Sequence, residues 1–516
     1  MQRLSFLFKK PWFLLVLGLC IAVASCQSST DSSTTEKDPT TAEGEKLAKQ
    51  YCSTCHSLVA PDALDKETWR KHALPAMAPK LGVEVWQQTH YYHPPSATIS
   101  QENWAKLVDY YEKLAPEKPI KATPPTPLVN DWSIFKLVKP AEIKTEIATT
   151  TMVTIDSTTG QIYTSKETDP ALYKWSATLK PTQVRTLPSP AVQADFVDDG
   201  TGSHRAMLTC IGTMLAVDKP LGELLEIGLD KSTTSAPVTL SNQLPRPIQS
   251  TAGDFNKDGL SDWIVCGFGH NAGGLYLLKQ RADHQFDKVV IKEVPGATQV
   301  ITGDFNHDGW LDFMALFAHA DEGIWLFTND QQGGFTDRNL LRFPPVYGST
   351  SFQLVDFNKD GRLDILYTCG DNSDYSRVLK PFHGVYIFIN HGSNQYKQTY
   401  FYPINGCTKA VAGDFDRDGD LDIATIAFFG DLKNNPAETF IYFEQKKTLT
   451  FIPHALPVYT YGRWICMDVK DWDHDGDLDI ALGNYSRGFL NEVGFTPTWN
   501  GFIPLIVLEN STSFLK

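Results

Sequence analysis

Residues 254–262 read DFNKDGLSD, and nearly the same nine letters return as DFNHDGWLD at 304, DFNKDGRLD at 356, DFDRDGDLD at 414 and DWDHDGDLD at 471. The five copies start 50 to 58 residues apart. Self-similarity at a near-fixed period is the sequence signature of a repeat architecture. This motif therefore decides the fold of the region that contains it.

Each period also carries four short apolar stretches. Around the first copy they are PIQSTAG (247–253), DWIVCGF (262–268), GLYLLKQ (274–280) and DKVVIKEV (287–294). Short strands with frequent turns predict an all-β unit, and four antiparallel strands arranged radially form a propeller blade.

Two weaker copies precede the five clear ones. Residues 150–186 keep the strand rhythm without the loop, and DFVDDG (195–200) keeps part of the loop. The sequence therefore predicts an all-β propeller of seven blades over 134–516. We expect GFIPLIVLEN (501–510) to supply the late strands of the last blade.

The repeats resemble the FG-GAP or VCBS family of propeller repeats, which includes the calcium-binding blades of integrin-like proteins. Calcium prefers six to eight oxygen ligands, and the glycine at position 6 permits the turn that wraps an ion. Positions 1, 3, 5 and 9 would supply the side chains, so we expect about five Ca²⁺ ions. An Asp/Asn/Gly turn without an ion is credible for one copy and poor for five, because clustered carboxylates repel one another. The expected ligands are Asp254, Asn256, Asp258, Asp262, Asp304, Asn306, Asp308, Asp312, Asp356, Asn358, Asp360, Asp364, Asp414, Asp416, Asp418, Asp422, Asp471, Asp473, Asp475 and Asp479.

The N-terminus reads as an export signal. Basic residues precede an apolar run from Trp12 to Val23, and the run ends in a Val-Ala-Ser-Cys sequence that resembles a bacterial lipobox. We expect residues 1–26 to be a lipoprotein signal, with Cys26 as the lipidated residue, and Ser/Thr-rich 27–42 to be a flexible tether. An ordinary signal peptide and a short membrane anchor are the alternatives. The expected location is exported and membrane-anchored, facing the periplasm or the cell surface.

Cys52, Cys55 and His56 form a CxxCH motif. Two thiols on one helical face can add to the two vinyl groups of a haem, and the adjacent imidazole can bind its iron. Residues 43–51 are expected to enter the motif as a helix, and a second helix is expected from an N-cap at Ser100 to Leu114. This segment resembles a small class I cytochrome c domain, all-α, over 43–117. A zinc or thiol-redox site is the alternative to one haem c.

Met77 is the expected second axial ligand, because it is the sole methionine between the motif and the closing helix. Its rivals are His72, His90 and His93. Residues 118–133 contain a proline-rich stretch and are expected to be a linker.

The calcium loops should share one face of the propeller, which leaves longer and more varied loops on the opposite rim. Variable loops on a rigid scaffold are where binding usually occurs. Candidate residues on that rim are His270, Asn271, His319, Asp321, Asp371, Asp431 and Arg487, with Arg246, Lys409 and Arg463 pointing toward the axis.

Together these features predict a multidomain, lipid-anchored electron-transfer protein whose propeller docks a redox partner, a small molecule or a glycan. The alternatives are a haem-linked dehydrogenase of a sugar or alcohol, and an adhesion or carbohydrate-binding module. The formal charge of −14 argues against nucleic acid as a partner.

Overall fold

The computed structural model describes residues 38–87, 90–92, 94, 96–141, 146–198, 204–229, 236–319, 321–373, 378–488 and 495–512. Residues 40–516 form one compact unit, and residues up to Pro39 form another. The predicted signal peptide, with Cys26, lies outside the described residues, and so does most of the tether.

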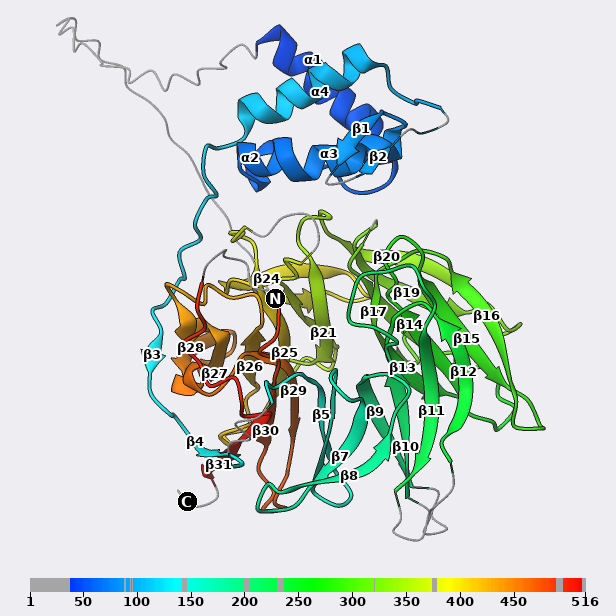
Figure 1. Ribbon diagram of the computed structural model, residues 1–516, viewed down its shortest axis with the longest axis vertical. Helices are drawn as coiled ribbons and strands as arrows, with labels where there is room; N and C mark the ends of the chain where they lie inside the picture. The colour runs from blue at the N-terminus through cyan, green and yellow to red at the C-terminus, as the bar shows by residue number, and fades with distance from the viewer. Residues whose placement is uncertain are drawn as a thin grey trace, which may run out of the picture. The chain divides into compact units, whose positions relative to one another are not determined.

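Seven sheets of four or five strands confirm the prediction of a seven-bladed propeller, and Figure 1 labels strands from every blade. Blades one to three consist of β5 (Thr150–Asp156), β6 (Gln161–Lys166), β7 (Ala171–Trp175), β8 (Pro181–Thr186); β9 (Ala191–Asp198), β10 (His204–Cys210), β11 (Gly222–Gly228), β12 (Val238–Leu244); and β13 (Pro247–Gly253), β14 (Asp262–Gly267), β15 (Gly274–Gln280), β16 (Phe286–Lys292).

Blades four to seven consist of β17 (Ala297–Gly303), β18 (Asp312–Phe317), β19 (Gly323–Asn329), β20 (Phe335–Arg342); β21 (Ser349–Val355), β22 (Asp364–Cys369), β23 (Gly384–Asn390), β24 (Tyr396–Pro403); β25 (Cys407–Gly413), β26 (Asp422–Ala427), β27 (Phe440–Lys447), β28 (Thr450–Ala455); and β29 (Trp464–Lys470), β30 (Asp479–Asn484), β31 (Leu505–Asn510). The second strands β14, β18, β22, β26 and β30 are buried along their whole length, because neighbouring blades cover both of their faces.

The last blade is completed by the N-terminal end of the propeller. The C-terminal stretch supplies one strand, β31, and not the several expected; the outermost strand is β4 (Phe135–Val138), which pairs antiparallel with β31. This pairing closes the ring, because strands from the first and last parts of the propeller share one sheet. The segment expected as a linker also supplies β3 (Val129–Asn130), which pairs in parallel with β28 (Figure 1).

A ring of hydrogen bonds joins the innermost strands of successive blades. Gln249 of β13 donates to the Val300 carbonyl of β17 at 3.1 Å and accepts the Val300 amide at 2.9 Å. Asp468 of β29 accepts the Ile155 amide of β5 at 2.7 Å, which links the last blade to the first. The side chains that make the equivalent contacts elsewhere are Thr151, Gln193, Gln299, Gln353 and Lys409.

The weak copy of the nine-residue motif that starts at Asp195 differs from the loop expected there. Asp195 lies within β9, opposite Met207 of β10, so it is part of a strand and not the first residue of a loop.

Residues 39–114 form a small, mainly helical region in which both predicted helices are present. The region also contains a short β-hairpin, so it is not all-α as predicted. Ser100 accepts the Asn103 amide at 3.2 Å, as an N-cap residue does. The region's elements are α1 (Pro39–Tyr51), η1 (Cys52–Thr54), η2 (Pro61–Ala63), α2 (Lys66–Thr68), η3 (Trp69–Ala73), α3 (Leu74–Met77), η4 (Ala78–Leu81), β1 (Val85–Gln87), β2 (His90–Tyr92) and α4 (Gln101–Leu114); the propeller adds short turns η5 (Pro436–Thr439) and η6 (Pro457–Thr460).

The two long helices cross closely at Gly44. A β-carbon there would lie 2.4 Å from Cβ of Tyr110 and 2.8 Å from the Lys106 carbonyl, so the crossing requires glycine. Beneath it Trp69 and Tyr111 pack with ring centroids 4.2 Å apart, and Tyr111 donates to the Val59 carbonyl at 3.0 Å. These contacts form the core under the CxxCH motif.

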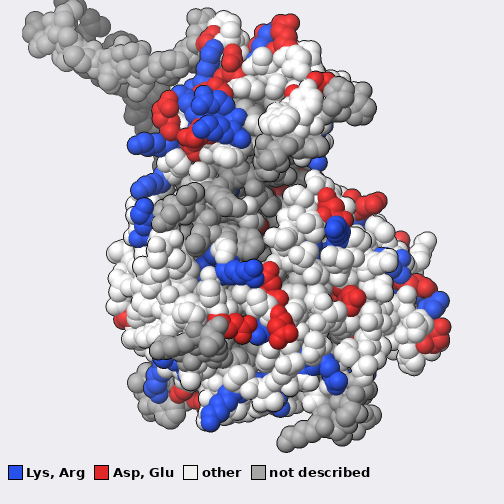
Figure 2. All heavy atoms as spheres, viewed as in Figure 1, with Lys and Arg blue, Asp and Glu red and all other residues white. Residues whose placement is uncertain are grey.

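Acidic and basic side chains lie interspersed among uncharged ones on the face shown in Figure 2. Among the described cysteines none forms a disulfide, and Cys210, Cys266, Cys369 and Cys407 are buried thiols. No helix in the part of the chain that the structure describes is long and apolar enough to cross a membrane.

Candidate functional site

The CxxCH motif begins where α1 ends. Cys52 starts the turn η1 and is half-buried, whereas Cys55 is exposed. Thr54 Oγ1 donates to the Tyr51 carbonyl at 2.7 Å and lies 3.6 Å from Cys55 Sγ, which fixes the turn between the two thiols. Both cysteines line the same cavity.

Burial affects the titration of the Cys52 thiol. Burial raises the pKa of this thiol to about 11, although a hydrogen bond with Tyr111 opposes the shift. Redox motifs and metal ligands need a thiolate, which is favoured by a lowered pKa. The Cys52 thiol is therefore mainly protonated near neutral pH, and it lies half-buried beside a largely apolar cavity.

His56 is held by its backbone neighbourhood. Its Nδ1 lies 2.9 Å from the Ser57 carbonyl, and Ser57 Oγ donates to the Phe343 carbonyl of the propeller at 2.8 Å. A histidine whose Nδ1–H donates to a carbonyl has its Nε2 lone pair left for a metal. This contact leaves Nε2 as the His56 ring nitrogen that could bind a metal.

The cavity has a volume of about 470 Å³, within the ~300–1,000 Å³ typical of ligand and cofactor sites. The helical region supplies a mainly apolar wall. Its residues are Tyr51, Val59, Leu64, Trp69, Ala73, Leu74, Met77, Lys80, Leu81, Trp104, Leu107 and Tyr111.

The second-ligand candidates are not equally placed. Met77 ends α3, is half-buried and lines the cavity. His72 is exposed and is not among the lining residues. The backbone of His90 is in β2 but its side chain is not described, and His93 lies outside the described residues. Met77 is therefore the candidate whose placement suits the role.

The propeller supplies a second, more polar wall. Four of the seven expected rim residues lie on it, and sequence reasoning missed Asn372 and Lys380. The polar lining residues are His270, Asn271, His319, Asp371, Asn372 and Lys380. They come from the loops that follow the second strands of blades three to five, so the propeller's symmetry brings them together. The sequence signal that could have pointed to Asn372 and Lys380 was the unusual length of the loop at 370–383.

The other predicted rim residues serve structural purposes or lie apart from the cavity. Asp321 accepts Arg342 Nε at 2.5 Å, and Asp431 accepts the Asn434 amide at 3.1 Å. Arg487 is exposed and is not a lining residue. None of the three contributes to the site.

The three basic residues that the sequence placed near the propeller axis make structural hydrogen bonds to backbone carbonyls. Arg246 donates to the Gly269 carbonyl at 2.7 Å. Lys409 donates to the Met467 carbonyl of the next blade at 2.8 Å. Arg463 is 1% exposed, donates to the Phe428 carbonyl at 3.0 Å and stacks on the Phe428 ring.

The five acidic loops share one backbone shape. Each joins the first and second strands of its blade, as the sequence predicts. In each, the position-6 glycine has φ of 80° to 92°, a left-handed conformation that favours glycine, and its amide donates to the position-1 aspartate at 2.7 to 3.2 Å.

The position-9 aspartates have a structural function that the spacing did not reveal. All five are fully buried as the first residues of second strands, and each accepts the amide of a third-strand residue of its blade. Burial raises the pKa of Asp422 and of Asp479 to about 7. They tie the loop to the blade whether or not they also bind an ion.

The loops fall into two classes according to position 3. Where it is asparagine, its amide donates to the position-5 aspartate at 2.9 to 3.0 Å, in the loops that start at 254, 304 and 356. Where it is aspartate, carboxylate oxygens gather within 4.8 Å of one another: Asp414 with Asp416 and Asp418, and Asp471 with Asp473 and Asp479.

These two clusters also leave oxygens unsatisfied. Asp414 Oδ1 and Asp471 Oδ1 are buried without a hydrogen-bond partner among the described residues. A buried carboxylate oxygen without a donor is costly unless a cation compensates it. The donor set therefore fits a hard cation such as Ca²⁺.

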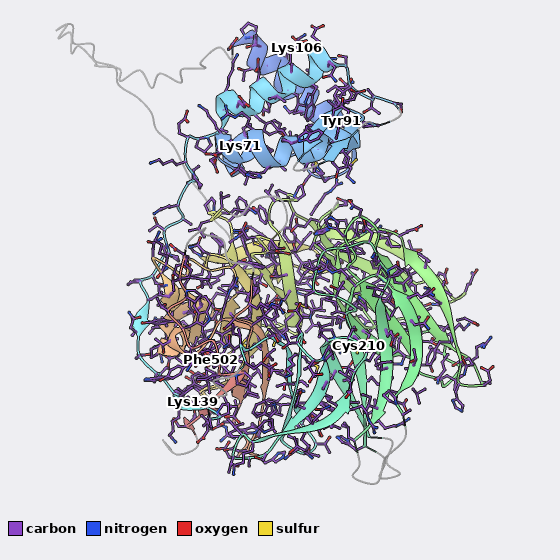
Figure 3. The ribbon with its side chains drawn as sticks, viewed as in Figure 1. Lys71, Tyr91, Lys106, Lys139, Cys210 and Phe502 are labelled. Carbon is purple, nitrogen blue, oxygen red and sulfur yellow. The ribbon has the colours of Figure 1, made fainter. Side chains whose placement is uncertain are left out.

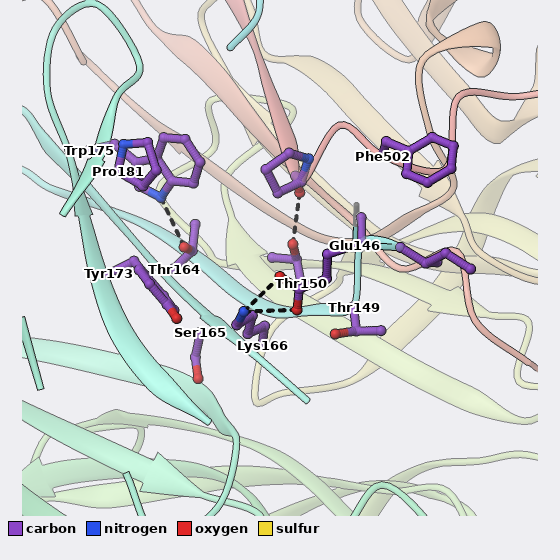
Figure 4. Close-up of a pocket in the computed structure, with 13 residues that line it drawn as sticks. Glu146, Thr149, Thr150, Thr164, Ser165, Lys166, Tyr173, Trp175, Pro181 and Phe502 are labelled. Carbon is purple, nitrogen blue, oxygen red and sulfur yellow. Dashed lines mark hydrogen bonds and ion pairs between the residues drawn. The ribbon is translucent and has the colours of Figure 1, made fainter. Parts of the chain in front are cut away.

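A second, smaller cavity of about 80 Å³ lies beside β6 (Figure 4). Lys166 Nζ donates to Glu146 at 2.8 Å, and Trp175 Nε1 donates to Thr164 Oγ1 at 2.9 Å. Its volume is well below that of typical ligand sites, and these polar groups bond to one another.

Comparison with protein families identifies FG-GAP-like repeats at residues 254–315 and 304–367. No curated protein matches the chain. Solved structures similar to it include an ancestral GH74 enzyme (11% identity, TM-score 0.44, 75% of this chain and 51% of that one), a protein from Lactobacillus plantarum (14%, 0.38, 58% and 82%) and the N-terminal domain of Nup159 (11%, 0.40, 75% and 100%). The chain thus spans about half the length of the GH74 enzyme.

Proposed function

We propose that this chain is an exported, lipid-anchored electron-transfer protein with one covalent haem c. The observation that carries the proposal is the cavity beside the CxxCH motif, which both thiols, His56 and Met77 line together. A haem bound there would supply reversible one-electron chemistry.

The chain's own residues would define that site. Cys52 and Cys55 would hold the group through thioethers, while His56 would present Nε2 to the iron, oriented by the Ser57 carbonyl. Met77 would be the second ligand, and a thioether in that position raises the potential. The apolar wall with Trp69 would exclude water, which also tunes the potential.

The propeller would be a calcium-stabilised docking module. The two clustered loops offer buried oxygens without donors, which supports Ca²⁺ there, and the common backbone shape supports it in the other three. A rigid propeller presenting varied loops on one rim fits a role in binding a redox partner or a ligand.

Covalent haem is tested with the full chain produced alongside a c-type cytochrome maturation system. Wild type should retain haem after denaturing electrophoresis, and the C52A/C55A double variant should lose it. The matched control is Cys369→Ala, which removes a thiol buried in the propeller. Wild type without covalent haem, or haem retained in the double variant, would refute the proposal.

Two further measurements test the role and the anchor. Reduced protein should pass its electron to an oxidised partner cytochrome. If a sugar or alcohol alone reduced the haem, the carrier proposal would be wrong and a dehydrogenase would be favoured.

Labelled fatty acid should be incorporated into the wild type but not into Cys26→Ser, and equal labelling of the two would exclude this lipid anchor.

A further inference from the structure

Position 4 of every acidic loop holds a basic residue. The expected calcium ligands come from positions 1, 3, 5 and 9, so ligand spacing does not require a basic residue at position 4. All five residues have a φ of 57° to 63°, a left-handed conformation that glycine adopts without strain. A long basic side chain where glycine would fit points to a function of the side chain itself. The five residues, all exposed, are Lys257, His307, Lys359, Arg417 and His474.

Lys359 shows where such a side chain reaches. Its Nζ donates to Asp420 Oδ1 at 2.7 Å, so the loop of blade five pairs with the loop of blade six. The hydrogen bond with Asp420 raises the pKa of Lys359 most, and the charges of Asp418 and Asp414 raise it further. Two of the three clustered carboxylates of blade six therefore interact with a cation that comes from the blade before.

Lys257 makes the same step from blade three to blade four. Its Nζ lies 4.4 Å from the ring centroid of Trp310, which is at position 7 of the next loop. The pKa of Asp308, at position 5 of that loop, is lowered mainly by the Trp310 amide and in smaller part by the charge of Lys257. This lysine, like Lys359, thus stabilises carboxylates of the following blade.

Two further side chains extend the pattern around the ring. Arg417 Nη2 lies 2.6 Å from the place that a β-carbon on Gly476 would take, in the loop of blade seven. His474 Nε2 lies 2.9 Å from the corresponding place at Gly160, in the turn between β5 and β6 of blade one. His307 makes no hydrogen bond or ion pair with any residue that the structure describes. Four of the five position-4 side chains therefore reach the blade that follows their own.

The cation from blade five leaves the centre of the blade-six cluster open. Lys359 pairs with Asp420 at position 7, while the buried Oδ1 of Asp414 has no hydrogen-bond partner among the described residues. Lys446 of β27 also lies near Asp416, but it pairs with Glu444 of its own strand. Lys359 thus compensates the loop's charge from outside and leaves room for an ion between the clustered oxygens.

We infer that the basic residue at position 4 of a loop is the counter-ion of the next loop's carboxylates and sets that loop's affinity for calcium. The inference rests on the proposed calcium sites and deepens them by naming the residues that tune them. Without calcium, the cation reduces the repulsion among the carboxylates. With calcium, it faces an ion of the same sign and therefore lowers the affinity. Neighbouring loops are thereby linked in one direction around the ring.

The test is hydrogen exchange of the full-length protein, measured by mass spectrometry over a calcium series, because separate peptides report the loops at 356–364 and 414–422. The variants are Lys359→Met and Lys359→Arg. The control is Lys139→Met, at an exposed lysine that follows β4 (Figure 3). Arg417→Met is an independent second variant, read at 471–479.

Lys359→Met should lower the calcium concentration that half-protects 414–422 by about three- to tenfold and leave the midpoint of 356–364 unchanged. In chelator the same variant should exchange faster at 414–422, because its carboxylates have lost a counter-ion. Lys359→Arg and Lys139→Met should match the wild type in both loops. If Lys359→Met did not fold, Arg417→Met should still lower the midpoint at 471–479 and not at 414–422.

Failures of the two proposals are distinguishable. Wild-type loops that calcium protects, with a midpoint that Lys359→Met moves at 356–364 instead of 414–422 or at neither loop, would overturn the inference and leave the calcium sites standing. An equal shift in Lys139→Met would assign the effect to net charge and also overturn it. Wild-type loops that gain no protection from calcium would overturn the calcium sites and the inference together.

Discussion

Asp416→Asn should stabilise the propeller in chelator and destabilise it in calcium. In the wild-type loop, carboxylate oxygens of Asp414 and Asp416 lie within 4.8 Å of one another. In the loops with asparagine at this position, the amide instead donates to the next aspartate. The substitution therefore removes a repulsion and adds a donor, but it also changes one calcium ligand.

The magnitude follows from Coulomb's law. Two unit charges 4.8 Å apart repel by about 0.9 kcal/mol at an effective dielectric of 80 and about 3.5 kcal/mol at 20. The loop is partly exposed, so we expect a gain of about 1–3 kcal/mol in chelator. With an unfolding entropy near 2.1 cal/mol/K per residue, a propeller of this length should melt about 1–4 °C higher.

The assay is thermal unfolding of wild type and variant, each in chelator and in a calcium series. A free calcium concentration of about 100 times the dissociation constant stabilises the folded protein by about 2.7 kcal/mol per site. Weaker calcium binding by the variant should therefore reverse the stability that it gains in chelator. The reciprocal change, Asn256→Asp, should lower the melting temperature in chelator and steepen the calcium dependence. Shifts of Asp416→Asn with the same sign in both conditions would refute the reasoning.

Three other changes probe separate parts of the chain. Phe135→Ala should lower the free energy of unfolding by about 3–5 kcal/mol in denaturant titrations, because this buried ring of β4 packs edge-on against Phe415 and Tyr442; a loss below 1 kcal/mol would mean that β4 does not close the ring. Met77→His should lower the midpoint potential while covalent haem is retained, and an unchanged potential would exclude Met77 as a ligand. Glu322 keeps its proton in the folded state up to about pH 8, whereas the unfolded chain loses it above about 4.5, so its contribution to stability should decrease as pH rises between these values. Glu322→Gln should flatten this slope in melts from pH 5 to 8, and an unaltered slope would contradict the buried, protonated state.

Much of the architecture could be predicted because its signals are local. The nine-residue motif specified a turn, the apolar stretches around it specified strands, and their period implied blades. Ser100 marked the start of α4 for an equally local reason, since an N-cap side chain bonds to an amide three residues on. Whether an acidic loop has asparagine or aspartate at position 3 could also be read from the sequence. Only the hydrogen bonds in the structure explain how the two classes of loop differ.

The sequence by itself therefore determined the repeat, the loop chemistry and the CxxCH motif. Tertiary structure alone decided which residues meet. β4 completes the last blade because ring closure joins strands more than 360 residues apart, and no local pattern encodes that pairing. Lys380 and Asn372 reached the cavity in the same way: their loop lines one cavity with His56 only after the blades have packed, so the variable rim loops could be predicted from the sequence but their meeting with the CxxCH motif could not.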